Sequence, residues 1–439
     1  MPRDLSELME SAVSSAPAEK HHAGDITRAA ERVQRRRTRG VAGAVVLAVV
    51  VVAGAVGFGA TRHHATSPEP VGPWKYGQHH TLSDAVASDS APWFETYDYP
   101  APSVLPGRGD HAPIPQYLDV DAEGRLAATR VTRTGADQTH ITATYQVVDG
   151  PKGPVHQVAA PPTDGGGVWE VSYTGHDQLM WGSPYGFVIT TWITDLVGDH
   201  ALVIDRKMDD VPGGKTVGGH PVVATWYEDG RMWFTAVTKD NFPGSLQWVS
   251  LYSFDPAHPA VLRAEKPHNA LAIDVEGGEA VWLDGSAVHA EELATGNERT
   301  VPVPMDSGCH IPSADQFAGV GVPAYLSTDG NLVSVVEQCQ RSWRLVVTDL
   351  AGRVVADVDS GTDDYVVRPT LTGDLVVFGG GGYVKGAGPT RSYALDLRSG
   401  RFVVLGGPQR NGLNRVVTGA GRYVLWYDRS GGHVGKLSG

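Results

Sequence analysis

The sequence feature that most constrains the fold is a glycine turn followed by a short apolar strand. The turn recurs at a nearly constant interval. Seven copies have their glycine at positions 124, 175, 230, 278, 330, 373 and 421, at intervals of 51, 55, 48, 52, 43 and 48 residues. Glycine suits these turns because hairpin turns need positive φ angles, which other residues adopt reluctantly. A second turn lies inside most units, as at 147–150, 292–296, 348–352 and 395–400. Each unit therefore predicts two hairpins, that is, four antiparallel strands.

Four strands repeated every 40–50 residues are typical of one blade of a β-propeller. We predict an all-β fold, a seven-bladed β-propeller over residues 110–439. Six blades are the alternative, because the unit around Gly175 is irregular. The last unit is too short for four strands, so a strand from residues 71–100 is expected to complete it and to remove an exposed edge. By its periodicity and turns, the region resembles bacterial membrane-anchored propellers with tryptophan–aspartate-like repeats.

Composition and charge exclude several other classes of protein. Glycine supplies 54 of 439 residues, 19% of residues are charged and 8% are aromatic. A disordered chain has fewer aromatic and more charged residues, and a coiled coil needs long runs of helix formers without glycine. Beyond position 40 there are 28 basic and 43 acidic residues, a net charge of −15. A nucleic-acid-binding domain needs a basic face, so nucleic acid is not expected as a partner.

Residues 41–60, VAGAVVLAVVVVAGAVGFGA, contain no charged side chain. A bilayer core of about 30 Å requires about 20 helical residues, so the segment predicts a transmembrane helix. A cleaved signal peptide and a buried core helix are the alternatives. Five arginines lie between positions 32 and 39, whereas Arg62 alone lies just beyond the other end. Cationic flanks stay in the cytoplasm, which predicts a single-pass protein of the cell membrane, with residues 1–40 inside and 61–439 extracytoplasmic.

The tail, residues 1–40, has apolar residues at helical spacing before and after Pro17. Such a tail, followed by an arginine-rich stretch and an Ala/Val span, is similar to bacterial transmembrane anti-sigma factors. This resemblance implies a helical cytoplasmic tail that contacts a sigma-factor-like partner. The zinc-binding His-x-x-x-Cys-x-x-Cys motif of one branch of these proteins is missing, since no cysteine precedes position 309. The alternative is a membrane-proximal helix whose basic residues contact anionic lipid head groups.

Residues 61–109 are expected to form a linker, because nine prolines occur between positions 61 and 115. Proline has no backbone donor and restricts the residue before it. Aromatic residues in the same stretch, such as Trp74 and Trp93, are expected to dock onto a neighbouring surface.

Two cysteines, Cys309 and Cys339, lie in the predicted extracytoplasmic part. Disulfides persist outside the cytoplasm, where an even number of cysteines is expected. We therefore predict a disulfide that ties the inner part of one blade to its own second or third strand. Two unpaired buried thiols are the alternative.

The sequence contains no motif for catalysis, metal binding or cofactor binding. The G-x-S-x-G, H-E-x-x-H and Walker A patterns are missing. Asp119–Gly124 begins like a calcium loop, but Arg130 stands where the loop needs a bidentate Glu, which favours an ordinary acidic turn.

The acidic pairs 209–210 and 363–364 are expected in solvated loops. The tryptophans at 181, 233, 282 and 426 recur at similar strand positions and are expected to pack between blades.

Two functions remain open. The first is a binding or sensory propeller that recognises a protein or cell-wall ligand outside the cell. The second is a propeller hydrolase or lyase that acts on an extracellular or cell-wall substrate. Propellers host both, so the fold does not choose between them. The missing motifs and the membrane anchor favour binding, without catalytic residues or a cofactor. Convergent carboxylates of perturbed acidity in a deep pocket would favour catalysis, and a shallow, aromatic or neutral mouth would favour binding.

Overall fold

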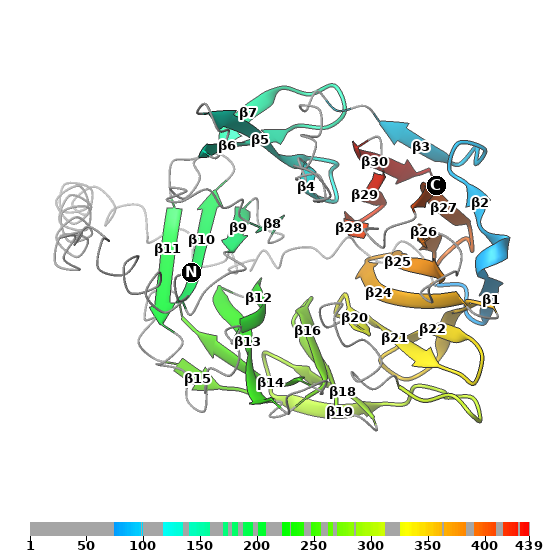
Figure 1. The fold of residues 1–439 in the computed structure, drawn as a ribbon. Helices are drawn as coiled ribbons and strands as arrows, with labels where there is room; N and C mark the ends of the chain where they lie inside the picture. Colours follow the sequence, from blue (N-terminus) through cyan, green and yellow to red (C-terminus); the bar gives the residue numbers. More distant parts are fainter. Residues whose placement is uncertain are drawn as a thin grey trace, which may run out of the picture. The chain divides into compact units, whose positions relative to one another are not determined.

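The computed structural model is described here over the part of the chain that begins at Trp74. The described residues are 74–97, 99, 117–134, 140–158, 170–173, 178–182, 188–195, 201–207, 222–228, 230–240, 247–255, 262–266, 270–284, 287–311, 325–361, 364–382, 390–409, 416–428 and 431–438. They form strands joined by turns, with one short 3-10 helix, η1 (Leu82–Asp84). The described fold is an all-β propeller in which the sheets surround a common centre (Figure 1).

Six of the sheets contain four consecutive strands each, numbered here in chain order. Sheet 1 has β4 (Tyr117–Val120), β5 (Leu126–Thr134), β6 (His140–Val148) and β7 (Val155–Val158). Sheet 2 has β8 (Glu170–Tyr173), β9 (Gln178–Gly182), β10 (Val188–Asp195) and β11 (Ala201–Lys207). Sheet 3 has β12 (Val222–Glu228), β13 (Arg231–Asp240), β14 (Gln247–Phe254) and β15 (Leu262–Ala264).

The chain continues in the same way through the next three sheets. Sheet 4 has β16 (Ala272–Glu276), β17 (Glu279–Leu283), β18 (Val288–Glu292) and β19 (Asn297–Val301). Sheet 5 has β20 (Leu326–Thr328), β21 (Leu332–Gln338), β22 (Trp343–Asp349) and β23 (Val354–Asp359). Sheet 6 has β24 (Asp364–Thr372), β25 (Leu375–Gly382), β26 (Thr390–Asp396) and β27 (Phe402–Gln409). A seventh sheet has three C-terminal strands, β28 (Val416–Ala420), β29 (Tyr423–Asp428) and β30 (Gly431–Leu437).

The repeated glycines stand where the sequence places them, between the first and second strands of their sheets. Gly124, Gly230, Gly278, Gly330, Gly373 and Gly421 all have φ between 58° and 85°. The seventh copy, Gly175, lies outside the described residues. The first strand of each sheet lies nearest the centre in Figure 1, where β28, β24, β20 and β16 follow one another as neighbours. The repeated glycine turns in the sequence therefore mark the inner strands of the propeller.

The last sheet is completed from the N-terminal side, as predicted. Strand β3 (Phe94–Tyr97) pairs antiparallel with β30, from Phe94 opposite Leu437 to Tyr97 opposite Val434. The ring of Phe94 packs on Trp426 and lies so close to Gly435 that a Cβ there would overlap it. This pairing covers the backbone edge that β30 would otherwise expose.

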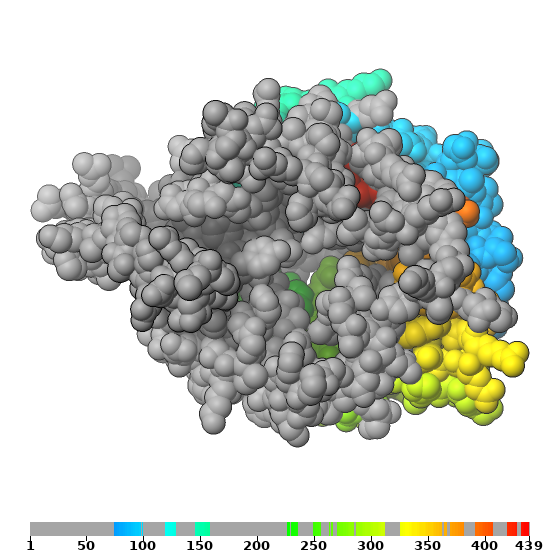
Figure 2. Space-filling model, viewed as in Figure 1, coloured from blue at the N-terminus to red at the C-terminus, as the bar shows by residue number. Residues whose placement is uncertain are grey.

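Two further N-terminal strands were not predicted. Strand β1 (Gln78–Thr81) pairs parallel with β23, and β2 (Val86–Ala87) pairs parallel with β27. Residues 74–99 thus pass along the outer strands of sheets 5, 6 and 7. They then reach sheet 1, where the hydroxyl of Tyr99 donates to the carbonyl of Gly124 (2.7 Å). We call residues 74–99 the strap; its blue strands form the rim beside yellow and orange residues in Figures 1 and 2.

The strap corrects the linker predicted over residues 61–109 and the propeller boundary placed at 110. Its strands contain two to four residues, which is too short for a visible period-two pattern. The number of prolines favoured a linker, but their positions leave room for the strands. None occurs between Pro73 and Pro92, so β1, η1 and β2 fall in the gap, and β3 falls between Pro92 and Pro100.

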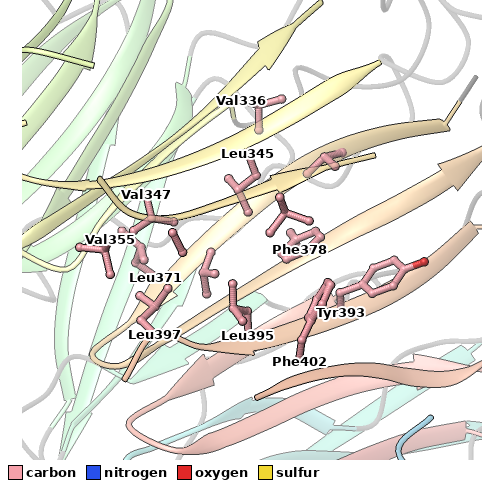
Figure 3. Packing of buried hydrophobic residues seen from close by; sticks show 14 of the residues in the cluster. Val336, Leu345, Val347, Val355, Leu371, Phe378, Tyr393, Leu395, Leu397 and Phe402 are labelled. Carbon is pink, nitrogen blue, oxygen red and sulfur yellow. The ribbon is translucent and has the colours of Figure 1, made fainter. Parts of the chain in front are cut away.

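The best-described part of the core lies between sheets 5 and 6. Val336, Leu345 and Val347 face Leu371, Phe378 and Leu395, and all six are fully or almost fully buried (Figure 3). Leu82 of the strap joins this cluster, and Trp74 packs against it. The aromatic residues of the strap therefore dock onto a neighbouring surface, as expected. That surface is the core of the propeller itself.

The predicted disulfide is present: Cys309 and Cys339 are bonded, with their Cα atoms 4.0 Å apart. Cys339 directly follows β21, the second strand of sheet 5, in agreement with the prediction. Cys309 does not belong to the inner part of the blade, however. It lies in the connection between β19 and β20, where a short extended segment pairs with the end of β21 through His310 and Gln338.

The predicted membrane span at 41–60 and the tail at 1–40 lie outside the described residues. Within the residues that are described, no helix is both long enough and apolar enough to cross a bilayer.

Shortening Phe94 tests the closure by β3. Replacing its buried ring with a methyl group in Phe94→Ala leaves a cavity beside Trp426 and Gly435, so the free energy of unfolding should fall by about 3–5 kcal/mol. Glu95→Ala in the same strand is the control, because Glu95 is exposed. Denaturant unfolding followed by tryptophan fluorescence measures both. Equal stability of the two variants would show that β3 does not close the last sheet.

Candidate functional site

The turns after the inner strands meet one another at one end of the propeller. A Cβ added to Gly277 would collide with the backbone of Asp329 and Gly330, in the next sheet. Gly421 similarly faces Ala122 of sheet 1. The strand ends and turns concerned are 119–124, 228–230, 274–278, 327–330, 371–374 and 419–421, and we call this surface the turn face. It brings together residues from six sheets near the centre of the propeller.

Side chains of the inner strands tie neighbouring sheets together beneath this surface. Asp274 of β16 accepts from the indole Nε1 of Trp226 in sheet 3 (3.1 Å) and from the backbone N–H of Thr328 in sheet 5 (2.8 Å). Ser327 Oγ accepts from the backbone N–H of Leu371 in sheet 6 (3.1 Å). These bonds cross three successive sheet boundaries and fix the relative positions of the inner strands.

Aspartates close the turns themselves. Asp121 Oδ1 accepts from the N–H groups of Glu123 (3.1 Å) and Arg125 (2.7 Å), and its other oxygen bonds the Arg125 guanidinium. Asp349, between β22 and β23, does the same with the N–H groups of Ala351 and Arg353 and with the Arg353 guanidinium. The shared pattern is Asp-x-x-Gly-Arg, at 121–125 and 349–353. The glycine of this pattern marked the turns in the sequence, whereas the aspartate and the arginine, also present there, were overlooked.

Hydrogen bonds engage both aspartates of the calcium-loop candidate. Asp119 accepts from the backbone N–H of Val120, and Asp121 accepts from the N–H groups of its own turn. Residues 119–124 therefore form a turn that Asp121 closes. Of the acidic pairs expected in loops, Asp364 is the first residue of β24, whereas positions 209, 210 and 363 lie outside the described residues.

The carboxylates of the turn face lie close enough to perturb one another. Desolvation raises the pKa of Glu276 well above its usual range, and the negative charges of Asp274, Asp329, Glu228 and Asp119 raise it further. These four residues come from four different sheets. The side chain of Glu276 is nevertheless exposed, so it is surrounded by protein but open to solvent. The turn face is therefore an acidic surface whose charges converge on Glu276.

Asp329 is the second strongly perturbed carboxyl group of the turn face. It is buried, and desolvation raises its pKa to about 6 despite the N–H groups of Asn331 (2.9 Å) and Leu332 (2.8 Å) that donate to its Oδ1. Glu228 is also engaged, since its Oε1 accepts from the N–H of Gly278 (2.9 Å). Most of the acidic groups thus hold turns in place, which leaves Glu276 as the exposed carboxyl group at their centre.

The tryptophans expected between blades divide into three cases. Trp233 packs with Val275 and Ala280 of sheet 4, and Trp426 packs with residues of sheet 6, so both confirm the prediction. Trp282 instead stacks on His289 of its own sheet, with ring centres 5.3 Å apart. The side chain of Trp181 lies outside the described part of the structure.

Comparisons with known proteins add similarity of fold alone. No family model and no curated protein matches the chain. Among solved structures, it is similar to a chain of a mitotic checkpoint complex (TM-score 0.42, 12% identity, 81% of this chain and 97% of that chain). It is also similar to the β-propeller domain of the Trilobed protease from Pyrococcus furiosus (TM-score 0.38, 10% identity, 64% and 80% covered). A third is the acylaminoacyl peptidase of Pyrococcus horikoshii (TM-score 0.44, 10% identity, 73% and 50% covered).

The perturbed acidity of Asp329 predicts a pH dependence of stability. Because its pKa is higher in the folded protein than in the unfolded chain, the free energy of unfolding should fall as the pH rises from about 4 to about 6. Asp329→Asn keeps an oxygen for both N–H groups but removes the charge. Relative to wild type, this variant should gain roughly 1–2 kcal/mol between pH 4 and pH 7.

Asp349→Asn is the matched control for this prediction. The pKa of Asp349 is lowered, because the backbone and guanidinium of Arg353 and the hydroxyl of Tyr76 outweigh desolvation. Its charge therefore stabilises the fold above the pKa of the unfolded chain, and the variant should lose stability at pH 7. Urea unfolding between pH 4 and pH 7 measures both effects. A wild-type pH dependence in Asp329→Asn would contradict the assignment.

Proposed function

We propose that the chain is a membrane-anchored, extracytoplasmic binding propeller whose turn face takes a positively charged ligand, either a protein or a cell-wall component. The observation that carries this proposal is the convergence of carboxylates from four sheets on the exposed Glu276. A rigid surface with fixed charges of one sign attracts ligands of the opposite sign and holds them in one orientation. The net charge of −15 beyond position 40 supports the same choice of ligand and disfavours nucleic acid.

Binding is preferred to catalysis because of how the carboxylates are used. Asp121, Asp274, Asp329 and Glu228 accept hydrogen bonds from the protein's own backbone, so they position turns and strands. A general acid and a general base must instead reach the substrate. The alternative, a propeller hydrolase or lyase, is supported by the raised pKa values of Glu276 and Asp329, since paired carboxyl groups of unequal acidity serve acid–base chemistry.

We further propose that the sheets close into a ring of seven blades. Contacts between inner strands join sheets 3 to 7 in order, then sheet 7 to sheet 1 and sheet 1 to sheet 2. The one step that this proposal adds is the junction between β8 of sheet 2 and β12 of sheet 3. Closure there would place every inner-strand turn at the same end of the ring.

The proposed location rests on the sequence and on the disulfide. The apolar segment 41–60 is long enough for a bilayer, and the arginines before it favour a cytoplasmic amino terminus. The Cys309–Cys339 bond supports an oxidising environment for the propeller. Inside the cell, we propose that residues 1–40 contact a sigma-factor-like protein, with anionic lipid as the alternative partner.

Protease accessibility tests this topology. In cells stripped of their wall, added protease should digest the propeller and leave a protected N-terminal fragment, which an amino-terminal epitope tag reports. Permeabilised cells are the control, because the tag should then also be lost. Loss of the tag alone from intact cells would reverse the proposed orientation.

Calorimetric titration with an oligolysine peptide tests the ligand class. The full chain should bind the peptide more weakly as salt increases. At a pH above the raised pKa of Glu276, Glu276→Gln should weaken binding about three- to tenfold by removing the central charge. Glu298→Gln, on the exposed outer strand β19, should leave binding unchanged. Equal binding by both variants would contradict the proposed face. If Glu276→Gln bound normally but abolished hydrolysis of a peptide or glycoside substrate, the enzyme alternative would be correct.

A further inference from the structure

A buried carboxyl group lies directly beside the disulfide, and strand geometry explains why. His310 and Gln338 exchange both backbone hydrogen bonds across an antiparallel bridge (2.9 and 2.8 Å). Side chains alternate between the two faces of such a pair. Cys309 and Cys339, on one side of the bridge, therefore share a face with Ile311 and Glu337 on the other. The sulfur atoms and a carboxylate oxygen of Glu337 all lie within 4.8 Å of one another.

Glu337 is unusual because, among the described residues, its buried carboxyl group has no hydrogen-bond partner and only a long ion pair. Its side chain is 0% exposed, and neither carboxylate oxygen accepts a hydrogen bond within the described part of the chain. The nearest cation, Arg344 Nη1, is 3.9 Å from Oε2. That guanidinium is already held by Asp306 (2.7 Å) and Asp357 (3.1 Å). Burying a carboxylate in this way costs stability, so packing alone does not explain a glutamate here.

The two cysteines of the disulfide beside it are only partly buried. Both sulfur atoms are used in the bond, so they offer no thiolate to a metal ion. What the arrangement offers instead is a bond that a thiol can attack and a carboxyl group that can supply a proton. A departing thiolate leaves more readily when its charge is neutralised.

We propose that Cys309–Cys339 is a site of thiol–disulfide exchange and that Glu337 is its general acid. A substrate thiolate attacks one sulfur, the Cys309–Cys339 bond breaks, and a mixed disulfide forms. The proton of Glu337 goes to the departing sulfur. A second substrate thiol then attacks the mixed disulfide, giving two protein thiols and the substrate disulfide. Overall, two substrate thiols are oxidised to one disulfide and the protein disulfide is reduced to two thiols, while Glu337 regains its proton from solvent.

The surrounding charges determine the pH at which Glu337 can act. Desolvation raises its pKa to about 7, against the opposing charge of Arg344, and Asp306 and Asp357 add to the increase. These groups come from β22, from the connection that carries Cys309, and from β23. The imidazole Nδ1 of His79, on β1, lies 2.6 Å from Asp357 Oδ2. Glu337 therefore holds a proton below pH 7 and loses it above.

The test measures reduction of the full chain by dithiothreitol between pH 5.5 and 8.5. Samples are quenched with acid and alkylated, and mass spectrometry gives the reduced fraction. Each rate constant is divided by the thiolate concentration, so that ionisation of the reagent does not contribute. The wild-type constant should fall about tenfold from pH 6 to pH 8, because the proton of Glu337 is lost and its negative charge repels the attacking thiolate.

Glu337→Gln should be about tenfold slower than wild type at pH 6, with a constant that does not change with pH. Glu291→Gln is the matched control. The pKa of Glu291 is also raised by desolvation, but it lies on β18, away from the disulfide, so its profile should equal the wild-type profile. A wild-type constant independent of pH would overturn the proposal even if Glu337→Gln did not fold. Persistence of the fall in Glu337→Gln would also overturn it.

Discussion

The antiparallel pairing of β3 with β30 is the contact on which the last sheet and its junction with sheet 1 depend. Without it, β30 would be an edge strand, and the sheet that joins the end of the chain to sheet 1 would contain three strands. Phe94 adds a buried ring to this pair, and Tyr99 continues the same segment to the carbonyl of Gly124. The contacts between turns across this boundary, such as Gly421 against Ala122, lie beside the closing sheet and rely on its position.

The repeat was readable from the sequence because a turn imposes a local requirement. A turn residue with a positive φ is usually glycine, whatever packs around it. The glycines of the inner-strand turns therefore revealed the repeat without any knowledge of the packing. The disulfide was readable because two cysteines allow one pairing. The parallel strands β1 and β2 carried no such signal, since their pairing depends on the outer strands β23 and β27, hundreds of residues away in the chain.

The candidate site was less predictable than the fold, for a related reason. Asp119, Glu228, Asp274 and Asp329 belong to four sheets, and their effect on Glu276 exists only after the inner strands are assembled. Each looked in the sequence like an ordinary acidic residue near a turn. The position of Glu337 was unpredictable for a different reason. It lies beside the cysteines because His310 pairs with Gln338, and the spacing of residues in the sequence does not reveal this register. Only the Asp-x-x-Gly-Arg pattern was present in the sequence and overlooked.

The strap has a consequence for the order of events during biosynthesis. Residues 78–97 are made before their partners in β23, β27 and β30, which follow hundreds of residues later in the chain. Throughout translation these short strands have nothing to pair with, and the sheet edges they will cover remain open. Such long-range pairing makes folding slow and leaves incomplete chains prone to aggregation. A ribosome that stalls before β30 is made releases a chain in which β3 has no partner and the last sheet is incomplete.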